Sequence, residues 1–120
     1  MISEITNKNI FTLRGQIKGF QMVRKLNENQ RIFIIYMDQI VSMIFITIFD
    51  NMIEISYVYT NDNFRKRGFA SMLVKHIMEL SKTLDVKIIK ASILPNSESL
   101  YVFKKNGFKI RNNIAELNLS

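Results

Sequence analysis

The chain contains no cysteine, so it can form no disulfide, provide no thiolate ligand and use no thiol nucleophile. Its single histidine, His76, fits a packed helix residue better than a metal ligand, and no cluster of His, Asp and Glu has metal-binding spacing. One proline and four glycines in 120 residues leave little material for a linker. These absences predict a single domain over residues 1–120 that needs neither an oxidising compartment nor a metal.

Long hydrophobic runs are also missing. The longest stretch without a charged side chain, residues 39–49, has 11 residues, whereas a helix that spans a membrane needs about 20. The first four residues, Met-Ile-Ser-Glu, lack the basic and then apolar layout of a signal peptide. We therefore expect a cytoplasmic protein that makes no membrane contact.

Positive charge is in excess, with 17 Lys and Arg against 10 Asp and Glu and a formal net charge of +7. Such an excess attracts anions, whether nucleic acid or a nucleotide-like cofactor, without choosing between them. One cluster is Arg65-Lys66-Arg67 and another is Lys104-Lys105, but there is no Lys-rich tail and no aromatic–basic signature of RNA recognition. A small basic nucleic-acid-binding domain is therefore kept only as an alternative.

Apolar spacing and turn residues predict an α/β fold with the order helix, three strands, helix, strand, helix, strand. Short links between the first three strands predict an antiparallel meander, and the strands on either side of the second helix are expected to pair in parallel. The result is a mixed central sheet with helices on both faces. The predicted helices cover residues 9–26, 69–84 and 97–105, and the predicted strands cover 32–37, 40–49, 52–60, 86–94 and a last segment from 108 with a hairpin at 112–113.

The hexapeptide Arg65-Lys66-Arg67-Gly68-Phe69-Ala70 joins a predicted strand to a predicted helix. The free N–H groups of a helix N-terminus attract anions, and the helix dipole adds positive charge there. Gly68 lets a phosphate approach the main chain, and the three cations offset its negative charge. The segment is therefore a candidate pyrophosphate site, with a solvated basic turn as the alternative.

Two separated motifs follow the predicted order of strands and helices. The first is Val58-Tyr59-Thr60 with Arg65-x-x-Gly68-x-Ala70-Ser71, and the second is Asn96-x-x-Ser99 with Phe103-x-x-x-Gly107-Phe108. The first motif resembles the acetyl-CoA signature of the GNAT N-acetyltransferases, Arg/Gln-x-x-Gly-x-Gly/Ala. The second motif is similar to another sequence motif of the same family. Asp38-Gln39-Ile40-Val41 also matches the hairpin that usually precedes the signature, so the resemblance covers about residues 31–110.

The resemblance implies a GNAT-like acyl-CoA N-acyltransferase fold, in which the strand before the signature splays from its parallel partner. The backbone of Val58 and Thr60 is then expected to bind the pantetheine arm of acetyl-CoA, with Asn96 and Phe103 along the arm. The N–H groups from Arg67 to Ser71 are expected to hold the pyrophosphate. The residues that the resemblance implies for acetyl-CoA binding are Val58, Tyr59, Thr60, Arg65, Lys66, Arg67, Gly68, Phe69, Ala70, Ser71, Asn96, Ser99 and Phe103.

The implied activity is direct transfer of an acetyl group to a primary amine of a small molecule or peptide, without a covalent enzyme intermediate. Glu54, eleven residues before Arg65, is similar in position to the glutamate of the histone-acetyltransferase branch. Strand alternation predicts Glu54 on the face of Ser56 and Val58, where a partly buried carboxylate can take a proton from the amine. An ordinary strand glutamate facing solvent is the alternative.

A departure at Phe103 keeps a second hypothesis open. Many family members have a tyrosine there, and phenylalanine has no proton to give to the departing thiolate. Tyr101 lies off that helical face, and Tyr57 and Tyr59 lie opposite Glu54 unless a bulge changes the strand. The alternative is a degenerate domain that binds acetyl-CoA as a regulatory module.

The N-terminus is shorter than the strand and two helices with which the family usually starts, since about thirty residues precede the meander. That region normally lines the acceptor pocket. A shortened one implies an open site or a site completed by a second subunit, so we expect a homodimer.

Overall fold

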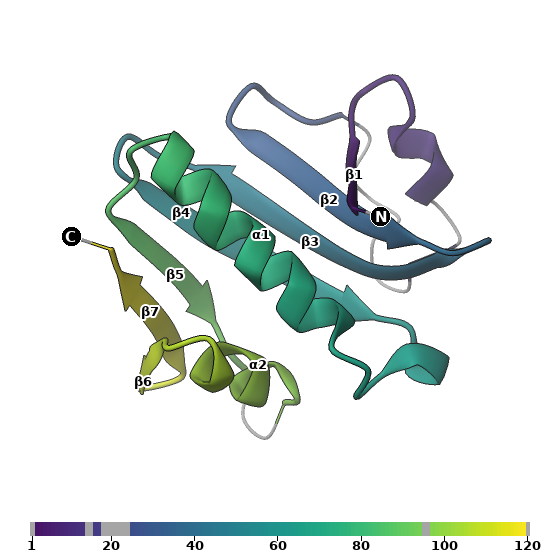
Figure 1. The fold of residues 1–120 in the computed structure, drawn as a ribbon. Helices are drawn as coiled ribbons and strands as arrows, with labels where there is room; N and C mark the ends of the chain where they lie inside the picture. The colour runs from purple at the N-terminus through teal and green to yellow at the C-terminus, as the bar shows by residue number, and fades with distance from the viewer. Residues whose placement is uncertain (1, 14–15, 18–24, 95–96, 120) are drawn as a thin grey trace.

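Seven strands form one mixed sheet in the computed structural model, which describes residues 2–13, 16–17, 25–94 and 97–119 (Figure 1). The strands are β1 (Ile2–Ile5), β2 (Gln30–Tyr36), β3 (Ile40–Ile48), β4 (Met52–Thr60), β5 (Ile88–Ser92), β6 (Lys109–Arg111) and β7 (Ile114–Asn118). The helices are the 3₁₀ helices η1 (Ile10–Leu13) and η2 (Asp62–Phe64) and the α-helices α1 (Phe69–Thr83) and α2 (Ser99–Lys105). The strand order is β1-β2-β3-β4-β5-β7-β6. None of the helices in this part of the chain is long and apolar enough to cross a membrane.

The predicted antiparallel meander is confirmed. β2 pairs antiparallel with β3, for example at Ile34 and Met43, and β3 pairs antiparallel with β4, for example at Ile44 and Val58. Asp38, in the turn between β2 and β3, has a positive φ of 61°, which Asp tolerates better than most residues. Short turns of this kind leave each strand beside the strand that precedes it.

The parallel pair of β4 and β5 is also confirmed, but it is short. β4 pairs with β5 only over Met52–Ile55, opposite Ile88–Ala91. Beyond Ile55, β4 keeps its pairing with β3 alone and diverges from β5. Among the described residues, the side of the β4 backbone that faces away from β3 therefore has no strand partner from Ser56 to Thr60.

Helix α1 crosses one face of the sheet diagonally (Figure 1). Its side chains Leu73 and Ile77 are buried in a core cluster with apolar residues of β2, β3, β4 and β5. The opposite face of β2 and β3 carries a second cluster, to which Ile10 and Leu13 of η1 belong. Because these central strands are covered on both faces, residues 40–46 are buried without alternation.

The short helix and the C-terminal hairpin are both confirmed. α2 packs beside the first turn of α1, where Asn106 Nδ2 donates to Ser71 Oγ at 3.1 Å. Gly107, with a φ of +90°, ends α2 in the left-handed conformation that Asn106-Gly107 predicts. Asn112 and Asn113 have φ values of 51° and 64°, as a two-residue type I′ turn needs. β7 therefore folds back between β5 and β6.

The N-terminal segment differs from the predicted helix over residues 9–26. It begins with β1, which the apolar spacing did not reveal and which pairs antiparallel with β2. Among the described residues of the predicted helix, Ile10–Leu13 form a helical turn and Lys25–Leu26 have no helical structure. Residues 14–15 and 18–24 of that segment lie outside the described residues.

Burial explains the misleading pattern. Ile10, Leu13 and Ile17 are all buried in the cluster on β2 and β3, so they keep a helical spacing without forming a continuous helix. Asn7 fixes the chain to Leu26, since its Nδ2 donates to the Leu26 oxygen at 3.0 Å and its Oδ1 accepts from the Leu26 nitrogen at 2.7 Å. These paired contacts tie the two ends of the segment together.

Strand β1 is held to β2 by an ion pair as well as by the strand ladder. Arg31 Nε donates to Glu4 Oε2 at 2.9 Å, and Arg31 Nη2 donates to Glu4 Oε1 at 2.7 Å. The guanidinium also lies 5.2 Å from the centre of the Phe33 ring. The hydrogen bond from Arg31 lowers the pKa of Glu4, against a smaller opposing effect of burial.

We predict that Glu4→Gln lowers the free energy of unfolding by about 1 kcal/mol at pH 7, a modest value because both side chains are about one-third exposed. Since the pKa of Glu4 is lowered in the folded state, its carboxylate stabilises the fold at neutral pH, and this contribution is lost as the pH falls below about 4. Urea unfolding at pH 7 and pH 3 measures the difference. The exposed Glu28→Gln is the control, and an equal effect of Glu4→Gln at both pH values would contradict the prediction.

Candidate functional site

A groove of about 860 Å³, here called the splay groove, opens where β4 and β5 diverge. Its walls come from the second half of β4, the turn before α1, the first turn of α1, the end of β5, and α2. The volume lies within the range of about 300–1,000 Å³ that is typical of small-molecule sites. The predicted cofactor residues that line it are Val58, Thr60, Arg65, Lys66, Gly68, Phe69, Ala70, Ser71, Ser99 and Phe103.

The other predicted cofactor residues are placed differently. Tyr59 packs against the second core cluster, on the sheet face opposite α1. The Arg67 guanidinium lies 5.5 Å from the centre of the Phe64 ring, and Phe64 meets Phe69 edge to face. Asn96 lies outside the described residues.

A β-bulge in β4 decides which of its side chains face the groove. Phe45 of β3 pairs with Tyr57, whereas the next residue, Ile46, pairs with Ile55. Ser56 is therefore the extra residue of the bulge, and it stands where β4 leaves β5. A bulge shifts the alternation of side chains by one position, so every later residue of β4 faces the other way.

The bulge overturns the predicted facing of Glu54. Val58 packs in the cluster under α1, whereas Tyr57 and Tyr59 pack against the opposite cluster. Glu54 also lies on that opposite face, because its two neighbours in the chain are buried under α1. Glu54 therefore shares a face with Tyr57 and Tyr59, and not with Val58.

Glu54 is exposed and does not line the splay groove. It makes no hydrogen bond or ion pair with any other described residue. The partial burial that we expected for this carboxylate is therefore wrong, and Glu54 can reach a substrate amine only from the open face of β4. Nor do the described residues place three His, Asp or Glu side chains where they could hold a metal ion.

The N-terminus of α1 opens into the groove without a side-chain cap. Gly68 is the N-cap residue, with a φ of +85°, and its oxygen accepts the first helical hydrogen bond from the Met72 nitrogen at 3.0 Å. The N–H groups of Phe69, Ala70 and Ser71 consequently have no acceptor within the helix. Converging N–H groups at a helix N-terminus can bind a phosphate.

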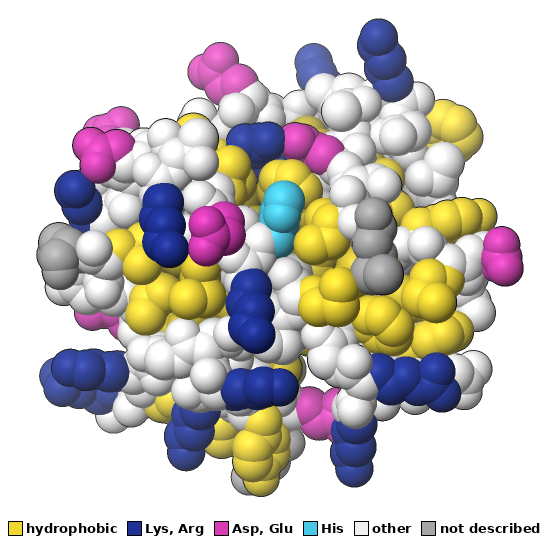
Figure 2. Space-filling view, viewed as in Figure 1, with side chains coloured by type: hydrophobic (Ala, Val, Ile, Leu, Met, Phe, Trp, Pro, Cys, Tyr) yellow, Lys and Arg dark blue, Asp and Glu magenta, His cyan; other side chains and the backbone are white. Residues whose placement is uncertain are grey.

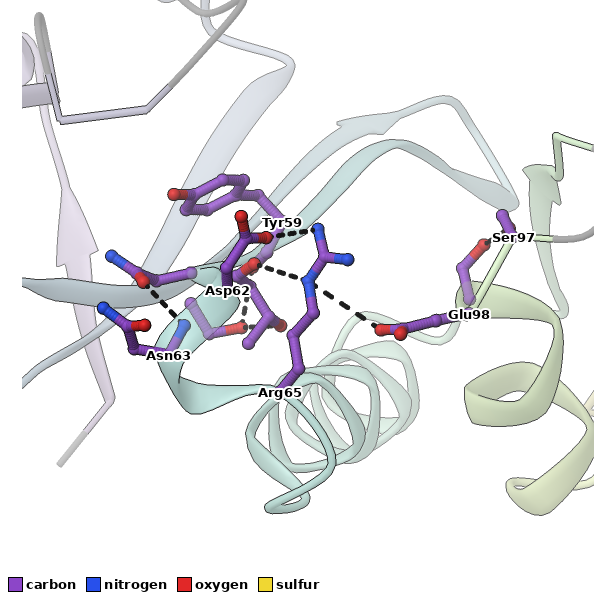
Figure 3. A network of polar contacts seen from close by, with 10 residues as sticks. Tyr59, Asp62, Asn63, Arg65, Ser97 and Glu98 are labelled. Carbon is purple, nitrogen blue, oxygen red and sulfur yellow. Dashed lines mark hydrogen bonds and ion pairs between the residues drawn. The ribbon is translucent and has the colours of Figure 1, made fainter.

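Arg65 joins the two sides of the groove mouth (Figure 3). Its Nη2 lies 3.0 Å from Asp62 Oδ1, and its Nε lies 3.8 Å from Glu98 Oε2 at the start of α2. The same Nε donates to the Thr60 oxygen at 3.4 Å. Arg65 thus connects the end of β4, η2 and α2, and two carboxylates share its charge.

The mouth of the groove is nevertheless positive. Lys66 and Lys105 line it in addition to Arg65. Figure 2 shows Lys and Arg side chains gathered along the lower part of the α1 face, where Figure 1 places α2 and the turn before α1. Such a potential raises the local concentration of a polyanionic ligand.

Helix α2 contributes one buried ring and one exposed ring. Phe103 is 1% exposed and packs against Phe108, with the ring centres 5.0 Å apart, so it belongs to the core beneath the groove. Tyr101 is 75% exposed and lines the groove, as does Leu94, which is 77% exposed. Tyr101 thus lies off the helix face of Phe103, as expected, but its own face borders the groove.

Tyr57 is a groove residue that was not among the predicted cofactor residues, and the bulge left open as an alternative above places it on the face of Glu54. It is half-buried and lines the groove close to the point where β4 leaves β5. Burial raises the pKa of Tyr57, and the neighbouring Tyr59 adds to the effect. The phenol therefore keeps its proton at neutral pH and can donate a hydrogen bond. Because only the bulge brings Tyr57 here, a regular alternation pattern could not reveal it.

Comparison with known proteins agrees with this geometry. The sequence matches the model of the acetyltransferase (GNAT) family over residues 7–108. No protein with a curated description matches it significantly. The predicted resemblance to GNAT proteins is therefore confirmed at the level of the family.

Solved structures share the fold at low sequence identity. The ribosomal-protein-S18-alanine N-acetyltransferase of Escherichia coli is 11% identical with a TM-score of 0.82, over 100% of this chain and 94% of that one. The IAA acetyltransferase of Bacillus cereus is 13% identical with a TM-score of 0.75, over 99% of each chain. An acetyltransferase of Bacillus subtilis in complex with CoA is 17% identical with a TM-score of 0.65, over 78% of this chain and 79% of that one. At these identities the likeness shows the fold alone.

Proposed function

The chain belongs to the GNAT family of acetyl-CoA-dependent N-acetyltransferases, and we propose that its splay groove binds acetyl-CoA and passes the acetyl group directly to a primary amine. One observation carries this proposal. The uncapped N-terminus of α1, behind the positive φ of Gly68, lies at the mouth of a groove whose wall is unpaired β4 backbone. The first feature suits a diphosphate and the second suits an arm built from amides.

The donor is expected to lie along β4. The pyrophosphate binds the free N–H groups of the first α1 turn, and Lys66 and Lys105 add positive charge. The amide groups of the pantetheine arm pair with the β4 backbone between Ser56 and Thr60, which β5 leaves open. The thioester then lies at the closed end of the groove, near Ile55, where the strands meet.

The reaction forms one bond and breaks one bond. The acceptor nitrogen attacks the thioester carbonyl carbon with a free lone pair, the N–C bond forms, and the C–S bond breaks. The amine gives up a proton and the CoA thiolate receives one. A thiol has a pKa of about 8.5, so the thiolate is a tolerable leaving group near neutral pH.

Two residues are proposed for the proton transfers. Glu54, exposed on the face opposite α1, accepts the amine proton through a water molecule. Tyr57 stabilises the departing thiolate with a hydrogen bond, because it lines the groove at the closed end, and the thiolate then takes a proton from solvent. Tyr57 thereby supplies the hydrogen-bond donor for the thiolate that Phe103, which has no hydroxyl, cannot supply.

A regulatory domain that binds acetyl-CoA without turnover is the second candidate. The buried ring of Phe103 and the exposed position of Glu54 favour it, since neither supplies a buried acid or base. Release of free CoA in the presence of a panel of amines separates the two functions. The homodimer and the cytoplasmic location stay predictions, which sedimentation and cell fractionation can test.

We predict that Gly68→Val weakens acetyl-CoA binding about tenfold or more. A Cβ at Gly68 meets nothing within 4 Å, so the new side chain occupies the groove mouth and not the core. Calorimetric titration with acetyl-CoA measures the effect, and wild-type protein should bind in the micromolar range, about −7 to −8 kcal/mol. If wild-type protein gives neither heat nor a shift in Tm at millimolar acetyl-CoA, the proposed function is wrong.

Gly107→Val is the matched control for this variant. Gly107 has a φ of +90° and equally open surroundings, but it does not line the splay groove. Both variants place a side chain in the left-handed region and should lose stability by about 1–2 kcal/mol. Only Gly68→Val should lose affinity, so equal affinity in the two folded variants would place the phosphate site elsewhere.

We predict that Glu54→Gln lowers kcat about 10²-fold at pH 7 and leaves acetyl-CoA affinity unchanged. The defect should shrink at pH 9, because more of the acceptor amine is then deprotonated without help. Steady-state kinetics at the two pH values measure it. Unchanged turnover at pH 7 would show that Glu54 is an ordinary strand glutamate without a role in proton transfer.

We predict that Tyr57→Phe lowers kcat about tenfold or more, whereas Tyr101→Phe has little effect. Both hydroxyls belong to residues that line the groove, but Tyr57 lies where β4 and β5 meet and Tyr101 lies on α2. The measurement is kcat with acetyl-CoA saturating. A larger loss in Tyr101→Phe would assign the hydrogen bond to α2.

A further inference from the structure

Another hollow lies across β5, β7 and β6 on the sheet face that points away from α1. It has a volume of about 530 Å³. The side chains of Ala91 and Ala115 point into the core under α1, so the residues next to them in β5 and β7 point to the outer face. We call the hollow across β5, β7 and β6 the basic hollow. Among the residues that line it are Lys90, Lys109, Arg111, Asn112, Ile114 and Glu116.

Two of the three cations in the basic hollow have no acidic partner among the described residues. Lys90 Nζ lies 3.4 Å from Glu116 Oε1, so this pair is close to neutral. Lys109 and Arg111 are exposed, and no carboxylate oxygen of the described residues lies within 4.0 Å of either. The hollow therefore offers two unpaired positive charges at the edge of the sheet.

The basic hollow and the splay groove share β5 as a wall. Ser92 lines the groove, and Lys90, two residues earlier on the same face, lines the hollow. Ser92 pairs with Ile114, which pairs with Arg111, so two strand spacings of about 4.8 Å separate Ser92 from Arg111. Arg111 thus lies about 10 Å from Ser92 at the edge of the groove, and Lys109 lies two residues away from Arg111 along β6.

Among the described residues, the two sides of the groove differ on this face. On this face, β2 and β3 are covered by N-terminal residues such as Ile10, Leu13 and Leu26. On the other side, Lys109, Arg111 and the other outward residues of β6 and β7 are exposed. A chain end fits this arrangement, whereas an internal segment would need space on both sides of its amine.

We propose that the acceptor is the free N-terminus of an acidic peptide, whose amine enters the splay groove near Ser92 and whose acidic side chain binds Lys109 and Arg111. This inference rests on the proposed function. An extended peptide advances about 3.3 Å per residue, so the fourth residue lies about 10 Å from the amine. The exposed Ile114 between the two ends gives an apolar contact to the intervening residues.

Other acceptors fit less well. The amine and carboxylate of a single amino acid are too close together to reach both the groove and the unpaired cations. A polyanion would meet the carboxylates of Glu54 and Glu116, which lie in one cross-strand row with Lys90 between them. A single acidic side chain at a fixed distance from the amine reaches the cations and meets only Glu116 of these two carboxylates, beside the two cations Lys109 and Arg111.

The test uses two peptides with a free N-terminus and a C-terminal fluorophore that differ only in Asp or Lys at the fourth position. Fluorescence anisotropy, with and without CoA, gives their affinities. Wild-type protein should bind the Asp peptide about tenfold more tightly or better at about 50 mM salt, and the preference should shrink at about 300 mM. Equal affinity for the two peptides would overturn the inference.

Charge-reversal variants test which residues cause the preference for the Asp peptide. The double variant Lys109→Glu/Arg111→Glu should lose or invert it, whereas Lys75→Glu/Lys82→Glu, the same change of charge on α1, should keep it. Unchanged Tm and CoA affinity show that the variants fold. If the double variant keeps the preference for Asp, the inference is wrong even though the protein binds CoA. If wild-type protein does not bind CoA, the proposed function itself is wrong.

Discussion

The separation of β4 from β5 beyond Ile55 is the constraint on which the rest of the structure depends. Backbone N–H and C=O groups that lose a partner must find another, in water or in a ligand. β3 satisfies one side of β4 up to Thr60, and the other side faces the splay groove. The bulge at Ser56 falls at the same place and adds the local twist that turns the strand away. The groove is thus produced by the strand pairing itself and not by loops laid around it.

The mouth of the groove depends on backbone conformation more than on side chains. Lys66 and Gly68 both have positive φ, and they lead the chain into α1 with its first N–H groups unpaired. Arg65 stabilises this turn through Asp62, Glu98 and the Thr60 oxygen, so it positions the turn as well as adding charge. A site made of N–H groups tolerates many side chains. This tolerance is consistent with a shared fold at 11% identity to the Escherichia coli enzyme.

Elements with strong local signals were predictable from the sequence. Turn residues between apolar runs marked the meander. Gly107 marked the end of α2, and Asn112-Asn113 marked the hairpin, because each of these turns has a local conformational cause. The predicted N-terminal helix is wrong, since Ile10, Leu13 and Ile17 keep a helical spacing only because the sheet buries them. The motif brought ten of the thirteen predicted cofactor residues to the wall of one groove. The facing of Glu54 and Tyr57 did not follow from the motif, because a bulge depends on how β4 pairs with β3 and leaves no local pattern.

The two faces of the sheet differ in how freely their side chains can change. On the α1 side, Phe103 is buried in the core, so a substitution at this position disturbs packing as well as the wall of the groove. On the outer face, the outward side chains of β6 and β7 are exposed, so they can change with little cost in stability. In the proposed arrangement, substrate choice can therefore change there while the splay groove stays the same. β5 is the exception, because Ser92 lines the groove and Lys90 lines the basic hollow, so a change in the position of this strand alters both at once.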